Sequence, residues 1–296
     1  MASYPPIPPQ MGANFTETIH NDTYSAIDPT KFDYTGRYIF ITGASKGVGL
    51  ATGIAYARAG AKGIALSARS DLETAKQKVL EAAKSAGKSA PQVLTFKSDV
   101  TKWEDVAHAA AETKKEFGRL DILINNAGFT EHWLPVADTD SNDWWTSFEV
   151  NIRGVYFQTK ALLPLMLKGG DKTFVNVASV GAHALIPGAS GYQTSKAALL
   201  RFTEHFMVDY AQQGVLAYCI NPGGIPTDLA LRLPTTLHEW LVDTVEMASD
   251  SMVFLTAEKR DWLAGRYIDC KWDMLELMSK KDEIENTDKL RMRMVV

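Results

Sequence analysis

A turn rich in glycine, Thr42-Gly43-Ala44-Ser45-Lys46-Gly47-Val48-Gly49, most constrains the fold of this chain. It follows the strand-like run Arg37–Ile41 and precedes an alanine-rich stretch, Leu50–Ala59, that is typical of a helix. Glycines permit a tight turn and a close approach of the backbone to a ligand, and a helix N-terminus favours the negative charge of a pyrophosphate. The pattern therefore predicts a strand, a turn and a helix that together can hold a pyrophosphate.

A second pattern indicates chemistry. Tyr192 and Lys196 stand four residues apart, and Ser179 lies thirteen residues before the tyrosine. On a helix, residues at this spacing project from one face, so an ammonium can lie beside a phenol. A free phenol has a pKa of about 10, and a nearby cation favours the phenolate. The pair therefore suggests a tyrosine that acts as an acid–base catalyst.

The spacing of tyrosine and lysine is not specific by itself. It also occurs at two other places, Tyr156–Lys160 and Tyr267–Lys271. Only Tyr192 has a hydroxyl residue thirteen positions earlier, Ser179, at the end of the apolar run 174–178. A serine that ends a buried strand more often bonds nearby backbone, so the interpretation depends on further motifs. The glycine turn is such a motif, although its spacing, G-x-x-x-G-x-G, differs from the usual G-x-G-x-x-G.

Together these motifs resemble the short-chain dehydrogenase/reductase family, whose members carry this variant glycine turn upstream of a Ser, Tyr, Lys set. Further family motifs occur in the expected order: Asn125-Asn126-Ala127-Gly128 after the apolar run 122–124, Asn151 at 28 residues before Ser179, and Asn221-Pro222-Gly223 followed by Thr227. The resemblance spans roughly residues 36–270. In its general sequence character the chain is most similar to fungal reductases of small-molecule or secondary metabolism.

The resemblance implies a role for each member of the catalytic set Asn151, Ser179, Tyr192 and Lys196. Tyr192 would give a proton to a carbonyl oxygen, or take one from an alcohol, while hydride passes to or from the nicotinamide C4. Ser179 would hydrogen-bond that oxygen. Lys196 would hold the ribose hydroxyls and, with the charge of the oxidised nicotinamide, favour the tyrosinate. Asn151 would anchor a water relay to solvent.

The resemblance also implies that the cofactor is NADP(H). NAD-preferring enzymes usually carry an acid after the second strand, which repels a 2′-phosphate. Here that position is neutral, Ser67 or Ala68, and Arg69 follows it, while Lys46 adds a second cation. The expected cofactor contacts are Gly43, Ser45, Lys46, Gly47, Val48, Gly49, Ser67, Arg69, Asp99, Val100, Asn126, Ala127, Gly128, Tyr192, Lys196, Pro222, Gly223, Ile225 and Thr227.

Length and composition favour one large unit. The chain has 296 residues, of which 46% are apolar, and strand–helix units follow one another with no Gly/Ser linker between them. We expect a single α/β domain over residues 36–272, a Rossmann-like, doubly wound parallel sheet with helices on both faces. Residues 1–35 form a Pro-rich arm that opens with Tyr4–Pro9, a polyproline II sequence, and is either disordered or wrapped around the domain or a neighbouring subunit. Residues 273–296 are expected to be a helical tail with an apolar stripe.

Charge and residue patterns exclude several classes of partner. The net charge of −4 leaves no basic surface for nucleic acid or membrane, so the partner should be a small molecule. The histidines share no ligand spacing, so no metal site is expected. Cys219 and Cys270 are expected to be buried thiols. With no run of eighteen apolar residues and no signal-like N-terminus, the protein is expected to be cytoplasmic.

The expected walls of the substrate pocket are residues 129–133, 180–187 and 225–234, the last of these being the usual lid. They are mainly apolar and aromatic, which favours an uncharged, fairly bulky carbonyl compound. His183 either bonds the substrate or faces water, and Trp133, Trp144 and Trp145 are interpreted as core. Two other functions stay open: a cyclase, dehydratase or epimerase that keeps NADP(H), and a nucleotide-sensing regulator, against which the intact catalytic set argues.

The helices that carry these motifs are too apolar for burial on one side alone. Apolar residues spread around much of the helix expected over residues 150–166, and the helix that begins near Ala197 repeats this. One side would pack on the sheet, and the other would form an apolar patch unusual for a monomer. We therefore expect a homodimer or homotetramer with a two-fold interface along these helices.

Overall fold

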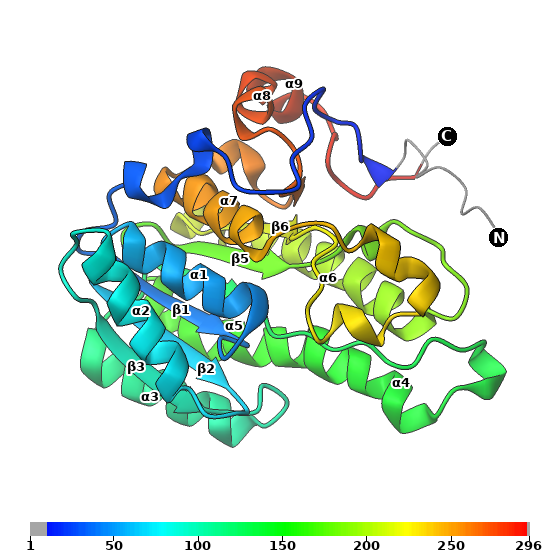
Figure 1. Cartoon of the computed structure of the whole chain (residues 1–296), viewed down its shortest axis with the longest axis horizontal. Coiled ribbons are helices and arrows are strands. Elements are labelled where there is room, and N and C mark those ends of the chain that lie inside the picture. Colours follow the sequence, from blue (N-terminus) through cyan, green and yellow to red (C-terminus); the bar gives the residue numbers. More distant parts are fainter. Residues whose placement is uncertain (1–10, 295–296) are drawn as a thin grey trace.

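A parallel sheet of seven strands forms the centre of the protein in a computed structural model that describes residues 11–294. The strand order is β3-β2-β1-β4-β5-β6-β7, and every neighbouring pair is parallel (Figure 1). The strands are Tyr38–Thr42 (β1), Gly63–Ala68 (β2), Gln92–Lys97 (β3), Ile122–Asn125 (β4), Thr173–Val177 (β5), Leu216–Asn221 (β6) and Tyr267–Asp269 (β7). The predicted fold class is confirmed.

Helices cover both faces of the sheet. They are Gly47–Arg58 (α1), Glu73–Ser85 (α2), Trp103–Phe117 (α3), Ser141–Phe148 (α4), Val155–Met166 (α5), Ser190–Tyr210 (α6), Val245–Ala257 (α7), Met274–Ser279 (α8) and Lys281–Glu285 (α9). Helices α1, α2 and α7 pack on one face, and α3, α5 and α6 pack on the other (Figure 1). Each face of the sheet has its own hydrophobic core. Successive side chains of a strand point to opposite faces, so in β1 Ile39 and Ile41 belong to one core and Phe40 belongs to the other.

The sheet places the predicted motifs at one edge. The strand order reverses beside β1, because β2 and β3 lie on one side of it and β4 to β7 on the other. The carboxyl ends of β1, β4, β5 and β6 all meet at this reversal, and each is followed directly by one of the predicted motifs. In open α/β sheets, ligands bind in the crevice outside such a reversal.

The described part of the N-terminal arm packs on its own chain. Trp272 donates its indole N–H to the carbonyl of Gly12 at 2.9 Å, and Ile19 forms an antiparallel bridge with Trp272. Further along, the Tyr34 hydroxyl donates to the carbonyl of Val253 on α7 at 2.6 Å. Of the alternatives left open by the sequence, residues 11–35 therefore wrap the domain that they precede. The polyproline II prediction for Tyr4–Pro9 lies outside the described residues.

The segment expected to be a helical tail contains two short helices, α8 and α9. Leu277 and Ile284 are fully buried, whereas Leu275 is 58% exposed, so the apolar stripe is narrower than its sequence suggests. Glu276 on α8 accepts the backbone N–H of Glu17, which joins the tail to the arm. Figure 1 shows the arm in blue and the tail in red on the same side of the molecule, next to α7.

Two further findings concern the described residues as a whole. Cys219 and Cys270 are both buried free thiols. Within residues 11–294, no helix is both long enough and apolar enough to cross a membrane.

Candidate functional site

The glycine turn forms a cradle at the N-terminus of α1. Gly43 and Gly47 have φ angles of +66° and +56°, in the left-handed region that glycine adopts without strain. A Cβ at Gly49 would lie 2.4 Å from the carbonyl oxygen of Gly43, and a Cβ at Gly43 would lie 2.9 Å from the Cα of Ala127. The side chain of the N-cap residue, Lys46, makes no capping hydrogen bond at the start of α1. Small residues and uncapped N–H groups at a helix N-terminus fit a pyrophosphate.

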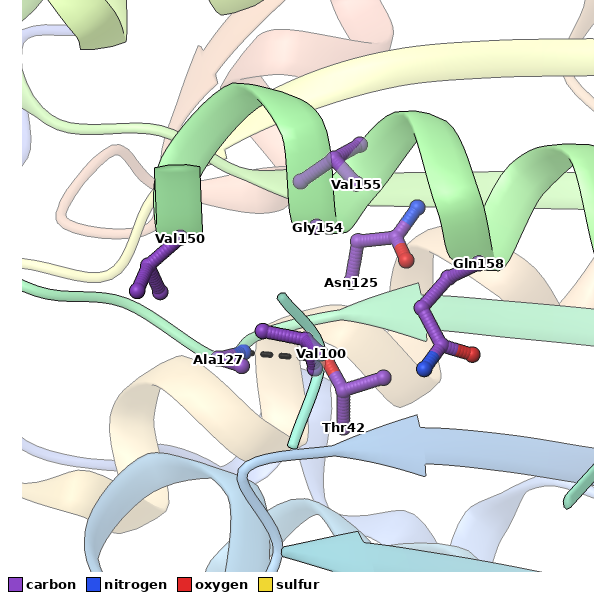
Figure 2. A pocket seen from close by; sticks show the side chains of 8 residues that line it. All are labelled: Thr42, Val100, Asn125, Ala127, Val150, Gly154, Val155 and Gln158. Carbon is purple, nitrogen blue, oxygen red and sulfur yellow. Dashed lines mark hydrogen bonds between the residues drawn. The ribbon is translucent and has the colours of Figure 1, made fainter. Parts of the chain in front are cut away.

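Asn126 joins this turn to the end of β4. Its Nδ2 donates to the carbonyl oxygens of Thr42 and Gly43 at 2.9 and 3.2 Å. The Thr42 hydroxyl in turn accepts the N–H of Ala127 at 3.0 Å, the bond drawn in Figure 2. Both residues line a small pocket whose other walls are Val100, Asn125, Val150, Gly154, Val155 and Gln158. The two motifs are therefore held in one fixed arrangement.

At the expected adenosine end, Arg69 is exposed and has no ion pair within residues 11–294. Ser67 is fully buried, and its hydroxyl has no hydrogen-bond partner among the described residues. Asp99 uses Oδ1 to accept the N–H of Thr101 at 2.9 Å. Although partial burial raises it, bonds from Thr101 and the nearby Arg69 hold the pKa of Asp99 below its usual value. Of the residues expected after β2, Arg69 is the one accessible to a ligand.

The second expected cation, Lys46, is not free. Its ammonium forms an ion pair with Asp228, in the segment 225–234 that we call the lid. Both side chains are about 70% exposed, and exposed pairs of this kind contribute little free energy. An incoming phosphate can therefore compete with Asp228 for Lys46.

Ser179, Tyr192 and Lys196 come together at the ends of β5 and α6. Helix α6 carries Tyr192 and Lys196 one turn apart, with the Lys196 Nζ 5.7 Å from the centre of the tyrosine ring. Ser179 and Tyr192 both lie against Gly181, because a Cβ there would be 3.2 Å from the serine Oγ and 3.3 Å from the tyrosine Cε1. The arrangement is the one that proton transfer to a substrate oxygen requires.

The electrostatics of the pair differ from the sequence-based expectation. Lys196 is 4% exposed and donates to the carbonyl oxygen of Val177 at 2.7 Å. Burial lowers its pKa to about 8. Burial has the opposite effect on Tyr192 and raises its pKa. The hydrogen bond with Ser179 lowers this pKa and the charge of Glu131 raises it, and the result is a pKa above the ordinary value. The pKa of Tyr192 is therefore raised on balance, because burial outweighs the hydrogen bond from Ser179.

Asn151 lies in a short π-helical stretch, Glu149–Gly154, directly before α5. Such stretches are rare and occur frequently at functional sites. The Asn151 amide donates to the carbonyl of Phe129 and to the hydroxyl of Ser195, both at 2.9 Å, and its Oδ1 accepts the N–H of Phe129 at 3.0 Å. Asn151 thus fixes the chain that follows the Asn125–Gly128 motif, and its water relay stays a prediction.

The turn expected to hold the nicotinamide carboxamide rests on a buried acid. Gly223 has φ +104°, and a Cβ there would lie 2.6 Å from the Oδ2 of Asp243. The same oxygen accepts the N–H of Gly224 at 2.6 Å, and Lys271 pairs with the other carboxylate oxygen at 3.2 Å. Pro222 precedes this turn, and Ile225, 5% exposed, follows it. Thr227 lies next, its methyl 3.3 Å from a Cβ built on Gly47.

The lid closes over the segment that follows β4. Leu229 lies 3.5 Å from a Cβ built on Gly128, and the Arg232 guanidinium stacks over the Phe129 ring at 4.8 Å. Arg232 also lies 3.6 Å from Asp143 on α4. The two expected pocket walls, residues 129–133 and the lid, are therefore in direct contact.

Two expectations about the pocket are revised. Trp145 is 58% exposed, so its interpretation as core is wrong; it lines a surface hollow with Val136, Thr139, Ser141 and Trp144. Trp133 and Trp144 are partly buried. His183 is partly buried, and its ring packs edge-on against Tyr267 at 4.7 Å and has no hydrogen-bond partner within residues 11–294. Burial lowers the pKa of His183.

Three residues at the site were not predicted from the sequence: Glu131, Asp228 and Asp243. Glu131 is 1% exposed and accepts the backbone N–H of Tyr192 at 2.9 Å. Its only sequence signal is an acid between the aromatic residues Phe129 and Trp133 of the segment 129–133. Asp228 and Asp243 match no motif and contact the predicted residues only through the fold.

Comparisons with known proteins agree with this geometry. The family model described as "short chain dehydrogenase" matches residues 37–237. "Short chain dehydrogenase mpl6" of Monascus purpureus is 52% identical over 289 residues, covering 98% of this chain and 99% of its own. "Short chain dehydrogenase pigC" of Monascus ruber is 46% identical over 284 residues, covering 95% and 93%.

Solved structures give the same result. Levodione reductase superposes with a TM-score of 0.71 at 26% identity, over 80% of this chain and 96% of its own. A short-chain type dehydrogenase/reductase from Mycobacterium marinum superposes with a TM-score of 0.71 at 28% identity, over 83% and 97%. The resemblance stated from the motifs is confirmed, including its similarity to fungal proteins, and the family binds nicotinamide cofactors. This chain belongs to the short-chain dehydrogenase/reductase family.

Proposed function

We propose that this protein is an NADP(H)-dependent oxidoreductase that reduces a carbonyl group of a small, fairly apolar metabolite, or oxidises the corresponding alcohol. The observation that carries the proposal is the cluster of Ser179, Tyr192 and Lys196 beside the glycine cradle. The nicotinamide would supply hydride exchange at its C4. The remaining chemistry is the movement of one proton, which these side chains can perform.

In the direction of reduction, the Tyr192 hydroxyl donates its proton to the carbonyl oxygen of the substrate. Ser179 supports that oxygen by a hydrogen bond, since its hydroxyl and the Tyr192 ring both lie against Gly181. Lys196 holds the ribose hydroxyls and, when charged, stabilises the tyrosinate that is left. Alcohol oxidation runs these steps in reverse and needs the tyrosinate at the outset.

The residues available for the cofactor fit NADP(H). The glycine cradle at α1 would receive the pyrophosphate, and the turn at Pro222 and Gly223 would receive the carboxamide. The guanidinium of Arg69 is exposed, and the preceding residues Ser67 and Ala68 at the end of β2 are neutral, so no acid stands at the position that would repel a 2′-phosphate. Lys46 can add a second charge once Asp228 releases it.

The pocket walls support an apolar substrate of some bulk. Phe129, Leu229 and Trp133 present apolar surface in the segments that surround Tyr192. The most similar relatives reported above come from fungi, which supports a role in fungal small-molecule or secondary metabolism. Within that class, the walls favour an uncharged ketone or aldehyde carried on a ring system.

We also propose a homodimer or homotetramer with a two-fold contact along α5 and α6. Tyr156 on α5 and Val208 on α6 are 43% and 79% exposed, and Phe157 and Phe202 are partly exposed beside them. Large apolar side chains exposed on neighbouring helices are typical of an interface.

The test is a panel of carbonyl compounds and alcohols, followed at the nicotinamide absorbance with each product identified by mass. We expect oxidation or reduction with NADPH or NADP⁺, and none with Tyr192→Phe. A product of unchanged oxidation state that still needs bound cofactor would instead identify a cyclase, dehydratase or epimerase.

A further inference from the structure

The N-terminus of α6, the helix that carries Tyr192 and Lys196, is capped by a residue that lies outside the helix. The N-cap residue of α6 is Ala189, whose methyl side chain accepts no hydrogen bond. The first N–H groups of a helix need such acceptors. Glu131, in the segment between β4 and α4, supplies one by accepting the N–H of Tyr192 at 2.9 Å. The capped group is therefore the backbone of the catalytic tyrosine itself.

The Glu131 carboxylate is built into this position. It is 1% exposed, and its second oxygen accepts the hydroxyl of Ser147 on α4. Its carboxyl carbon would lie 3.0 Å from a Cβ at Gly191, so the helix approaches it as closely as a glycine permits. No ion pair neutralises it within residues 11–294. The positive end of the α6 dipole is what makes a buried negative charge tolerable here.

We propose that Glu131 is a positioning residue for Tyr192, which fixes the tyrosine backbone and whose negative charge favours the neutral phenol, and therefore carbonyl reduction, at neutral pH. The inference rests on the proposed function. In reduction, hydride goes to the carbonyl carbon and the phenol O–H proton to the oxygen, giving the alcohol, the oxidised cofactor and a tyrosinate. Oxidation has to begin from that tyrosinate, which the Glu131 charge opposes.

Among the titratable groups that face Tyr192, Glu131 is the one that carries a negative charge. After burial, Glu131 is the group that raises the pKa of Tyr192, and Ser179 opposes it. Lys196, on the same helix, loses its charge near pH 8 because burial lowers its pKa to about 8. Tyr267 on β7 is neutral because burial raises its pKa well above 10. His183 packs on Tyr267, and burial lowers its pKa.

The decisive variant is Glu131→Gln, which removes the charge and keeps the shape. Its amide oxygen still accepts the N–H of Tyr192, and its amide N–H₂ donates to the Ser147 hydroxyl, which in the wild type donates to Glu131. We expect the pH midpoint of alcohol oxidation to move to lower pH, and the kcat of oxidation at neutral pH to rise several-fold above that of the wild type. A midpoint equal to that of the wild type would overturn the proposal.

Two control variants separate charge from shape. Glu131→Asp keeps the charge with a shorter side chain, so its midpoint should stay near that of the wild type even where the cap is weakened. A midpoint displaced as in Glu131→Gln would show that shape and not charge is responsible. Ser147→Ala removes the second hydrogen bond alone and should leave the midpoint in place.

A titration without substrate distinguishes failure of this inference from failure of the proposed function. The ultraviolet difference spectrum between each protein and its Tyr192→Phe version reports tyrosinate formation at this one residue. A shift between wild type and Glu131→Gln with no nicotinamide-linked turnover would refute the proposed function and leave the electrostatic role of Glu131. Turnover that depends on Tyr192, with no shift, would refute the role of Glu131.

Discussion

Lys46 of the glycine turn forms an ion pair with Asp228 of the lid, so the cation expected to bind a 2′-phosphate is already held from the other side of the site. The pair also joins the two segments that would enclose a cofactor. Its two side chains are too exposed for the pair to be strong, and phosphate and carboxylate compete for one ammonium.

Replacing Asp228 with Asn should therefore improve the use of NADPH. An exposed pair contributes about 0.2–1 kcal/mol, so we expect the KM for NADPH to fall by about 1.5- to 5-fold while the KM for NADH stays constant. Steady-state kinetics with both cofactors measure this. In a Lys46→Met background the same change should have no effect, and an equal gain in that background would contradict the competition.

Arg69 should carry most of the preference for NADPH. Charge-assisted hydrogen bonds contribute about 1.5–3 kcal/mol, so Arg69→Gln should reduce kcat/KM with NADPH by about 10- to 100-fold and leave NADH unaffected. Lys84→Met, which removes an exposed charge near the far end of α2, is the matched control and should change neither value. Equal use of NADH and NADPH by the wild type would refute the preference.

Tyr192→Phe should abolish turnover while NADPH affinity stays within a few-fold, because the ring remains and only the proton donor is lost. Turnover and fluorescence titration of NADPH binding check the two halves separately. Normal turnover in this variant would remove Tyr192 from the acid–base role. A large loss of affinity would instead assign it to cofactor binding.

Asp250 on α7 makes the stability of the protein depend on pH. It accepts the hydroxyl of Thr23 in the arm, and burial raises its pKa from 3.8 to about 6. Between the two pKa values, Asp250 is protonated in the folded protein and ionised in the unfolded chain. Its contribution to the free energy of unfolding is therefore full below pH 4 and is lost as the pH rises through 6. One pKa unit corresponds to about 1.4 kcal/mol. Between pH 4 and 7, the free energy of unfolding of Asp250→Asn should therefore increase by roughly 2–4 kcal/mol relative to that of the wild type.

Urea unfolding of both proteins across this pH range measures that difference. The comparison cancels the other carboxyl groups, because only residue 250 differs. A constant difference between pH 4 and 7 would show that Asp250 does not titrate in this window.

Light scattering at micromolar concentration should report two or four chains. Val208→Asp places a charge on the exposed face of α6 and should yield monomers that keep the fold by circular dichroism. Lys114→Glu, a charge change on the exposed surface of α3, is the control and should leave the mass unchanged. A monomer mass for the wild type would show that these helices form no interface.

Local motifs made the fold and the catalytic set predictable. Tyr192 and Lys196 are joined by one helical turn, and the glycine turn is a continuous segment, so their geometry follows from their spacing. Glu131 and Asp243 could not be predicted in this way. Each acts on backbone many residues distant, Glu131 on Tyr192 and Asp243 on Gly224, and such contacts exist only once the sheet and the helices are packed. The raised pKa of Tyr192 was missed for the same reason, because it arises mainly from burial.

The arm has a consequence for how the chain is made. The residues joined by the hydrogen bond between Gly12 and Trp272 are 260 positions apart in the sequence. Tyr34 and its partner Val253 on α7 are 219 positions apart. The first described residues to leave the ribosome therefore bind partners that are synthesised 219 to 260 residues later. Contacts of such long range form slowly and leave apolar surface uncovered in the meantime. We expect the nascent arm to stay sensitive to protease until the last strand, β7, has emerged, and stalled ribosomes carrying chains of graded length can measure when that protection begins.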